Sequence, residues 1–539
     1  MFMKNTFKYI MVGIVAAVAF WGCNSLDQAP TNKFEENTFW TSKDRAQMVV
    51  NMAYNQMYGV GKMWSDEYLG DNMIAKRDRN PEERQIRQGS AHPGMGLFSG
   101  EWSWAYGGIK TTNVFMDKVG LVPDLSTEER QAMEAQIRFI RAYLYFRLTN
   151  FYGAVPFFLG DITLEEAKVM PRTPRAEVIA TLHKELDEII PQLPQSVPAA
   201  RNGEIRQAAA AMLKARFYLY DGDFENAAKI CGEIMEGKYG HYELFQTKTP
   251  VYSSYEDLFT SANEFNVEVI LSYSMMPIIR EWSLNDKVPN STVGSMGAYF
   301  FPTESLAKEY IKLDGQPFEY PTTNTSCYTD RDPRMDATIV RHNSVWRDVD
   351  LASGAATTKT INIVSDATDG INKGNATETG YYVRKWFDPA HRADMLISTD
   401  IIMMRYADVL LMYAESMNEI GQMSEQVWNS TIRPIRERAG FTQQGALQYP
   451  NLDQAAMREI IRRERRCELA LEGLRYYDII RWNAGLELLN FDLMSAKFTG
   501  TTEQSSIFKY KFTSRDMLWP VPQSQINNYP SLAPQNSGY

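Results

Sequence analysis

The sequence has few of the residues from which metal centres and disulfide frameworks are built. Its 539 residues include 4 cysteines and 5 histidines. Cys23, Cys231, Cys327 and Cys467 form no Cys-x-x-Cys pair, and no histidine stands at a zinc-ligand spacing from any of them. The histidines form no His-Glu-x-x-His motif either. These absences argue against a structural zinc site and a disulfide scaffold, and we expect no metal and no other cofactor.

An excess of positive charge is also missing. The chain has 56 Lys and Arg against 66 Asp and Glu, a formal net charge of -10, and no basic stripe runs along it. We therefore expect no nucleic acid as a partner. No Gly-x-Ser-x-Gly elbow occurs, and no group of residues assembles a nucleophile, a base and an orienting side chain. The sequence thus predicts a protein that is not an enzyme.

Long hydrophobic runs are absent except near the N-terminus. Two lysines precede an apolar stretch at residues 9–21, which is shorter than the roughly 20 residues of a transmembrane helix. We interpret residues 1–22 as a signal peptide. Cys23 follows directly, an arrangement that resembles a bacterial lipoprotein signal, in which this thiol is acylated; an ordinary secretory signal with a chance cysteine is the alternative. Residues 23–32 are polar and are expected to form a tether.

Apolar residues at helical spacing dominate the first half of the remaining chain. Ser126 and Glu129 form a capping box, and the apolar residues after them step by three and four. Residues 208–237 predict a helical hairpin with small residues on its first helix, as in a tetratricopeptide repeat. Residues 401–421 repeat this pattern. We therefore expect a mostly α-helical fold in which helix pairs stack into a superhelix.

Residues 240–400 follow a different pattern. Clusters of Gly, Pro, Asn, Thr and Asp interrupt short apolar pieces such as residues 267–274. We expect loops and short strands here, laid on the helical frame, and we expect the ligand there because binding residues are often carried by loops on a rigid scaffold. One loop gathers Asp330, Asp332 and Asp336. A cation site is one reading of it, but Asp-Pro followed by Arg favours a turn with local ion pairs.

A long helix is predicted over residues 457–482. At about 100° per residue, Glu464, Glu468 and Arg475 fall near the centre of its apolar stripe. Charges on a buried stripe must be paired, so these three residues are expected to form a structural ion-pair network. In the alternative, Glu464 and Glu468 would be a glycosidase pair. That chemistry needs carboxylates on opposite sides of a cleft, whereas these two project from one helix.

Four further segments carry distinctive motifs: "RAYLYFRLTNFYGAVP" at 141–156, "RYADVLLMYAESMNE" at 405–419, "IRRERRCELALEGLRYYDIIRW" at 461–482 and "LWPVPQSQI…NYPSLAPQNSGY" at 518–539. With the lipoprotein signal, they resemble the SusD/RagB family of outer-membrane nutrient-binding lipoproteins. The resemblance implies one domain over residues 33–539, with about four tetratricopeptide-like helix pairs and a ligand site on loops opposite them. It also implies that the protein captures oligo- or polysaccharide at the cell surface. The partner would be a SusC-like TonB-dependent transporter in the outer membrane, to which the lipid anchor holds the protein.

The ligand residues have to be inferred from physics, because the matched motifs belong to the framework. Sugar rings expose CH faces that stack on aromatic side chains, and polar side chains orient the hydroxyls. The expected ligand residues are Trp64, Trp282 and Trp346, in irregular stretches, and Asp71, Arg77 and Arg79, in a loop whose position resembles the family's ligand rim. A binder of peptides or glycopeptides for the same kind of transporter is the alternative, and a pure scaffold or adhesin is a further one.

Overall fold

The structure is a computed structural model that describes residues 39–79, 81–248, 253–293, 297–322, 326–366, 368–371, 373–498 and 503–539. The predicted signal peptide, Cys23 and the tether lie outside these residues.

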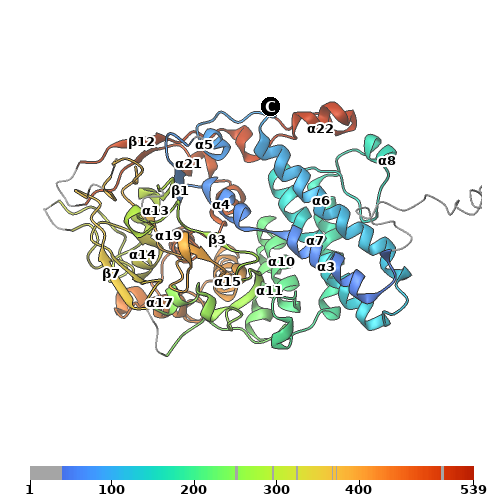
Figure 1. Ribbon diagram of the computed structural model, residues 1–539, viewed down its shortest axis with the longest axis horizontal. Coiled ribbons are helices and arrows are strands. Elements are labelled where there is room, and N and C mark those ends of the chain that lie inside the picture. Colours follow the sequence, from blue (N-terminus) through green and yellow to red (C-terminus); the bar gives the residue numbers. More distant parts are fainter. Residues whose placement is uncertain are drawn as a thin grey trace, which may run out of the picture.

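Among the described residues, eight helices of 12 or more residues contact one another in chain order. They are α3 (Lys43–Met57), α6 (Gly96–Lys118), α7 (Thr127–Tyr152), α9 (Arg175–Ile189), α10 (Gln207–Tyr220), α11 (Phe224–Met235), α15 (Tyr406–Glu419) and α19 (Gln454–Glu468). In succession they make four pairs: α3 with α6, α7 with α9, α10 with α11 and α15 with α19. In Figure 1, α3, α6, α7, α10 and α11 fill one half of the molecule, and the strands lie in the other. The predicted superhelix of helix pairs with a loop-and-strand side is confirmed.

Local sequence explains how these helices begin and pack. The Ser126 hydroxyl accepts the Glu129 N–H, and the Glu129 carboxylate accepts the Ser126 N–H, so the predicted capping box starts α7. In the hairpin of α10 and α11, residues 208–211 are buried alanines, which let the neighbouring helices approach closely. Asp223 then caps α11. The sequence prediction for residues 401–421 is right from Tyr406 onward, since the first five residues form a strand instead.

The predicted helix over residues 457–482 is wrong as a single element. α19 ends at Glu468, and a short helix, α20 (Arg475–Arg481), begins after a break. Within the break Leu471 has φ 62° and Gly473 has φ 75°, backbone conformations that end a right-handed helix. The buried Glu67 carboxylate accepts the N–H groups of both residues, which supplies the hydrogen bonds that a continued helix would have made.

Short antiparallel strand pairs fill the loop-rich half. The described residues form six two-stranded sheets: β1 (Met73–Ala75) with β4 (Phe300–Pro302), β2 (Val269–Tyr273) with β10 (Ile401–Arg405), β3 (Trp282–Ser283) with β9 (Leu396–Ile397), β5 (Ile339–Val340) with β8 (Tyr382–Val383), β6 (Val345–Val349) with β7 (Ala356–Thr360), and β11 (Asp492–Met494) with β12 (Ser506–Lys509). Strand β2 lies within the apolar piece at residues 267–274. Most of these pairs join segments far apart in the chain, so the irregular half is closed by long-range contacts.

Short helices connect these elements: α4 (Val60–Tyr68), α5 (Glu82–Arg87), α8 (Leu164–Val169), α12 (Ser254–Asp257), α13 (Glu304–Glu309), α14 (Pro333–Thr338), α16 (Glu425–Ser430), α17 (Ile432–Ala439), α18 (Gln444–Leu447), α20, α21 (Gly485–Leu488) and α22 (Gln523–Asn528). Asp332 caps α14 and pairs with Arg334, while Asp336 pairs with Arg341. In the described part of the chain, no helix combines the length and the apolar character needed to cross a membrane.

Candidate ligand-binding face

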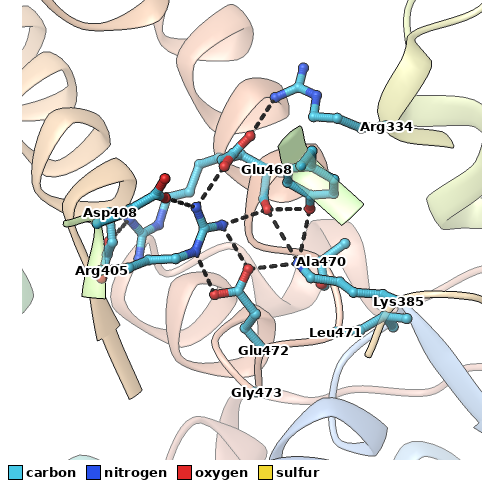
Figure 2. Close-up of polar contacts among 12 residues, drawn as sticks. Arg334, Lys385, Arg405, Asp408, Glu468, Ala470, Leu471, Glu472 and Gly473 are labelled. Carbon is cyan, nitrogen blue, oxygen red and sulfur yellow. Dashed lines mark hydrogen bonds and ion pairs between the residues drawn. The ribbon is translucent and has the colours of Figure 1, made fainter. Parts of the chain in front are cut away.

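The carboxylates of Glu464 and Glu468 lie in a buried cluster of arginines. Figure 2 shows Glu468 between Arg334 and Arg405. Glu468 pairs with Arg334 at 3.0 Å, with Arg405 at 2.6 Å and with Arg438. Glu464 shares Arg334, at 2.7 Å. Burial alone would raise the pKa of Glu468, but the three guanidinium groups outweigh it and lower the pKa below its usual range. An ionised carboxylate enclosed by arginines has no proton to donate and no access to a substrate, so this geometry does not suit a glycosidase pair.

Arg475 and Asp71 belong to a second buried cluster. Arg475 donates to Asp71 at 2.7 Å, and Arg466 pairs with the same carboxylate at 2.9 Å. Burial raises the pKa of Asp71, yet the two arginines outweigh that effect and lower the pKa to about 2. Asp71 is 2% exposed. The structure thus places this carboxylate beneath the loop, where it fixes α20 and α19 to the segment before β1. The prediction that Asp71 contacts the ligand is therefore wrong.

The three tryptophans expected as platforms are buried. Trp64 lies in α4 and is 5% exposed, Trp282 lies in β3 and is 6% exposed, and Trp346 lies in β6 and is 2% exposed. The Trp64 and Trp282 rings pack against each other, with centroids 6.4 Å apart, and Trp346 packs on Phe387 at 4.5 Å. Such rings present no free face to a sugar, so they are core residues. Short elements between loops look irregular in sequence, and this is why the expectation failed.

Arg77 and Arg79 are exposed directly after β1. The Arg79 guanidinium lies 4.0 Å from the centre of the Tyr299 ring, and the Arg77 N–H donates to the Glu378 carboxylate at 3.0 Å. We call Arg77, Arg79, Tyr299 and Glu378 the rim. The rim joins two segments more than 200 residues further along the chain to the loop after β1, and it offers charged donors, an acceptor and an aromatic ring at the surface.

An open groove of about 830 Å³ adjoins the rim at Arg77. Its other walls come from Arg84 and Gln88 at α5, from residues 490–492 and from residues 507–511; we call this the groove. In Figure 1, α5, α21 and β12 lie along the same edge of the molecule. The volume is within the range of small-ligand sites.

Strand alternation explains the lining of the groove. Successive side chains of a strand point to opposite faces. In "IFKYKF" at residues 507–512 the burial of alternate residues continues beyond the end of β12 at Lys509, so the segment separates into two sets. Phe508, Tyr510 and Phe512 are buried and pack under the strand, whereas Lys509 and Lys511 are exposed. The Phe491 ring stacks on Tyr510 with centroids 4.6 Å apart. None of the expected ligand residues lies in this segment, although its period-two alternation is visible in the sequence.

A second cavity of about 400 Å³ lies in the helical half, between α6, the segment around α8 and α22. Trp102, Tyr106, Phe158 and Tyr529 contribute aromatic side chains to it. Trp102 is buried, and the Tyr106 hydroxyl donates to the Pro156 carbonyl at 2.7 Å. This cavity is an alternative docking place for a ligand. The described residues contain no group of three or more His, Cys, Asp or Glu side chains arranged to hold a metal ion.

A stack of helix pairs that carries an irregular, grooved face defines a scaffold-type ligand-binding protein. Two family models match the chain: residues 274–539 match the SusD family, and residues 24–219 match a model described as "Starch-binding associating with outer membrane". The chain belongs to the SusD/RagB family.

Similar proteins cover most or all of the chain. A SusD-like protein of Formosa agariphila is 25% identical, over 99% of this chain and 100% of that protein. The starch-binding protein SusD of Bacteroides thetaiotaomicron is 25% identical, over 81% of this chain and 78% of SusD. Among solved structures, a SusD-like carbohydrate-binding protein of Bacteroides fragilis has a TM-score of 0.80 and 26% identity, and the match covers 92% of this chain and 100% of that one.

Proposed function

We propose that the protein captures oligo- or polysaccharide at the cell surface and delivers it to a SusC-like TonB-dependent transporter in the outer membrane. The observation that carries the proposal is the open groove of about 830 Å³ beside a rim of polar and aromatic side chains, on the loop side of a SusD-family scaffold. SusD of Bacteroides thetaiotaomicron is named for starch binding, which supports a carbohydrate as the ligand. The protein binds this ligand without altering it.

The weak affinity expected of a single glycan site explains why the protein would work next to a transporter. A few stacked and hydrogen-bonded sugars must offset the entropy lost when a flexible glycan is ordered, so one site binds weakly. Holding the binder next to a transporter raises the local ligand concentration and compensates for the weak affinity. Acylation of Cys23 would hold the protein at the membrane, since each buried methylene of an acyl chain contributes about 0.8 kcal/mol. Incorporation of labelled palmitate into the wild-type chain, and its loss in Cys23→Ala, tests this anchor.

A glycan array followed by titration calorimetry on the full chain tests the ligand. Tyr299→Ala removes the ring under Arg79 at the rim, and Tyr529→Ala removes a ring from the second cavity, so the two variants are matched in side-chain loss. We expect Tyr299→Ala to weaken glycan binding and Tyr529→Ala to leave it unchanged. If Tyr529→Ala weakened glycan binding and Tyr299→Ala left it unchanged, the second cavity would be the binding site. Binding of peptides with no binding of any glycan would favour the peptide alternative instead.

A further inference from the structure

We infer that the groove binds an anionic stretch of glycan, one that carries uronate carboxylates or sulfate esters. The inference rests on the proposed function and adds the chemical class of the ligand. The groove is lined by four cations, Arg77, Arg84, Lys509 and Lys511, and by one carboxylate, Asp492. The chain as a whole has a net charge of -10, so this local excess runs against its average. Positive side chains gathered in a groove attract anionic ligands and concentrate them there.

The ammonium groups of the two lysines form no ion pair within the described part of the chain. Lys509, the last residue of β12, and Lys511, two residues beyond it, are both exposed, and among the described residues no carboxylate lies within ion-pair distance of either ammonium group. Asp492 stands opposite Lys509 in the β11–β12 ladder and moderates its field, yet one carboxylate faces four cations. Because the lysines are two residues apart, their Cα atoms lie at most about 7 Å apart, and both can contact successive groups of an extended polyanion.

Two buried guanidinium groups contribute to this positive potential: Arg84, one of the four lining cations, and Arg87, which adds to them. Arg84 and Arg87 are both buried on α5, and in the described part of the chain neither forms an ion pair with a carboxylate. Arg84 donates to the Ala75 carbonyl at 2.6 Å and lies over the Phe508 ring, 4.4 Å from its centre. Arg87 lies over Tyr476, 5.2 Å from the ring centre. A cation held in a low-dielectric floor without a counter-ion acts strongly on the solvent-filled space beside it.

The remaining charges and the apolar lining define the ligand further. Glu378 accepts the Arg77 N–H at the rim and acts on Arg84 through space, and Asp492 faces Lys509, so among the described residues Lys511 is the lining cation with no carboxylate placed beside it. The half-buried Phe491 and Ile507 give the groove an apolar strip. A ligand that fits both features has CH faces for the strip and negative groups for the lysines, which describes an acidic saccharide better than a neutral one.

Calorimetry on the full chain tests the charge requirement with ligand pairs that share a sugar backbone and differ in their charged groups. Oligogalacturonate is compared with its carboxyl-reduced form, and sulfated dextran oligosaccharide with dextran, at low and high salt. We expect the charged member of at least one pair to bind about tenfold or more tightly than its neutral form, and we expect salt to weaken it. The pair that responds identifies carboxylate or sulfate as the recognised group.

Lysine variants test whether the charged ligand binds in the groove. Lys509→Gln/Lys511→Gln is expected to weaken the charged ligand about tenfold and to leave the neutral form unchanged. Lys229→Gln, an exposed lysine on α11, is the matched control and is expected to bind like the wild type. Equal binding of charged and neutral forms, or an unaffected double variant, overturns the inference while glycan binding stands. Lysine-dependent binding of an oligodeoxynucleotide as tight as that of the charged saccharides also overturns it. If no glycan binds at all, the proposed function fails as well.

Discussion

Arg405 donates hydrogen bonds to both the side chain and the main-chain carbonyl of Glu468. Its Nη1 donates to the side-chain Oε1 at 2.6 Å, and its Nη2 donates to the main-chain carbonyl at 2.8 Å (Figure 2). Arg405 ends β10 directly before α15, and Glu468 ends α19. Lys385 extends the arrangement by donating to the Ala470 carbonyl at 2.8 Å and to Glu472 at 2.7 Å. Side chains thus satisfy carbonyls that a helix end leaves unpaired, and they tie the last helix pair to the strand side.

Replacement of Glu468 by Gln should destabilise the protein strongly. The variant keeps the volume of the side chain but leaves Arg334, Arg405 and Arg438 short of one buried negative charge. Removing one partner of a buried ion pair costs about 3–5 kcal/mol. Chemical denaturation should show a fall of this size in the free energy of unfolding. Glu459→Gln, on the exposed face of the same helix, should change it by less than about 0.5 kcal/mol. Equal stability of the two variants would contradict a structural role for the cluster.

Gly473→Ala should cost more than an ordinary glycine substitution. Gly473 has φ 75°, and a Cβ there would lie 3.1 Å from both the Met63 carbonyl oxygen and the Tyr58 hydroxyl. Gly421, after α15, has nearly the same φ, 70°, but open space around its Cβ position. Both variants carry the backbone cost of about 1–2 kcal/mol, and only Gly473→Ala adds the clash, about 1 kcal/mol or more. Thermal melts of the pair separate the two effects. A loss in Gly421→Ala as large as in Gly473→Ala would show that packing around the break is loose.

Sequence patterns predict the scaffold better than the site, for a physical reason. The capping box at Ser126 and the alanines of α10 act through neighbours in sequence, so periodicity reveals them. The break after Glu468 depends on Glu67, about 400 residues away, and nothing in the local pattern reports it. The groove likewise joins α5 to strands near the C-terminus. Arg77 and Arg79 were predicted from their position in the family pattern, and their role in ligand binding stays a prediction, whereas the place of Lys509 and Lys511 beside them follows only from the folded structure.

Trp282→Ala should act on stability and leave ligand recognition in the folded protein unaffected. The ring is buried against Trp64 and Trp386, and its Nε1–H donates to the Thr399 carbonyl at 3.0 Å. Truncation of a buried tryptophan creates a cavity and costs about 3–5 kcal/mol. Denaturation should report that loss, and calorimetry well below the melting temperature should give a wild-type affinity for the glycan. A stable variant with abolished binding would restore Trp282 as a platform.

The stability of Glu304→Gln relative to the wild type should increase as the pH rises. Glu304 is buried, and although the Tyr381 hydroxyl donates to it and the charges of Lys308 and Arg331 act on it, burial dominates and raises its pKa to about 7. The folded wild type therefore holds a proton that the unfolded chain has released. The stabilisation that the protonated Glu304 carboxyl group contributes is fully present below about pH 4.5 and is lost as the pH rises through 7.

The neutral glutamine has no such dependence. The free energy of unfolding of Glu304→Gln minus that of the wild type should therefore grow between pH 5 and pH 8, by at most about 3 kcal/mol. Denaturation curves at pH 5, 6, 7 and 8 measure this difference. Glu459→Gln, whose carboxylate is exposed, should show a flat difference over the same range. A flat line for Glu304→Gln as well would mean that the buried carboxylate is ionised throughout, held by Lys308 and Arg331 more strongly than burial opposes it.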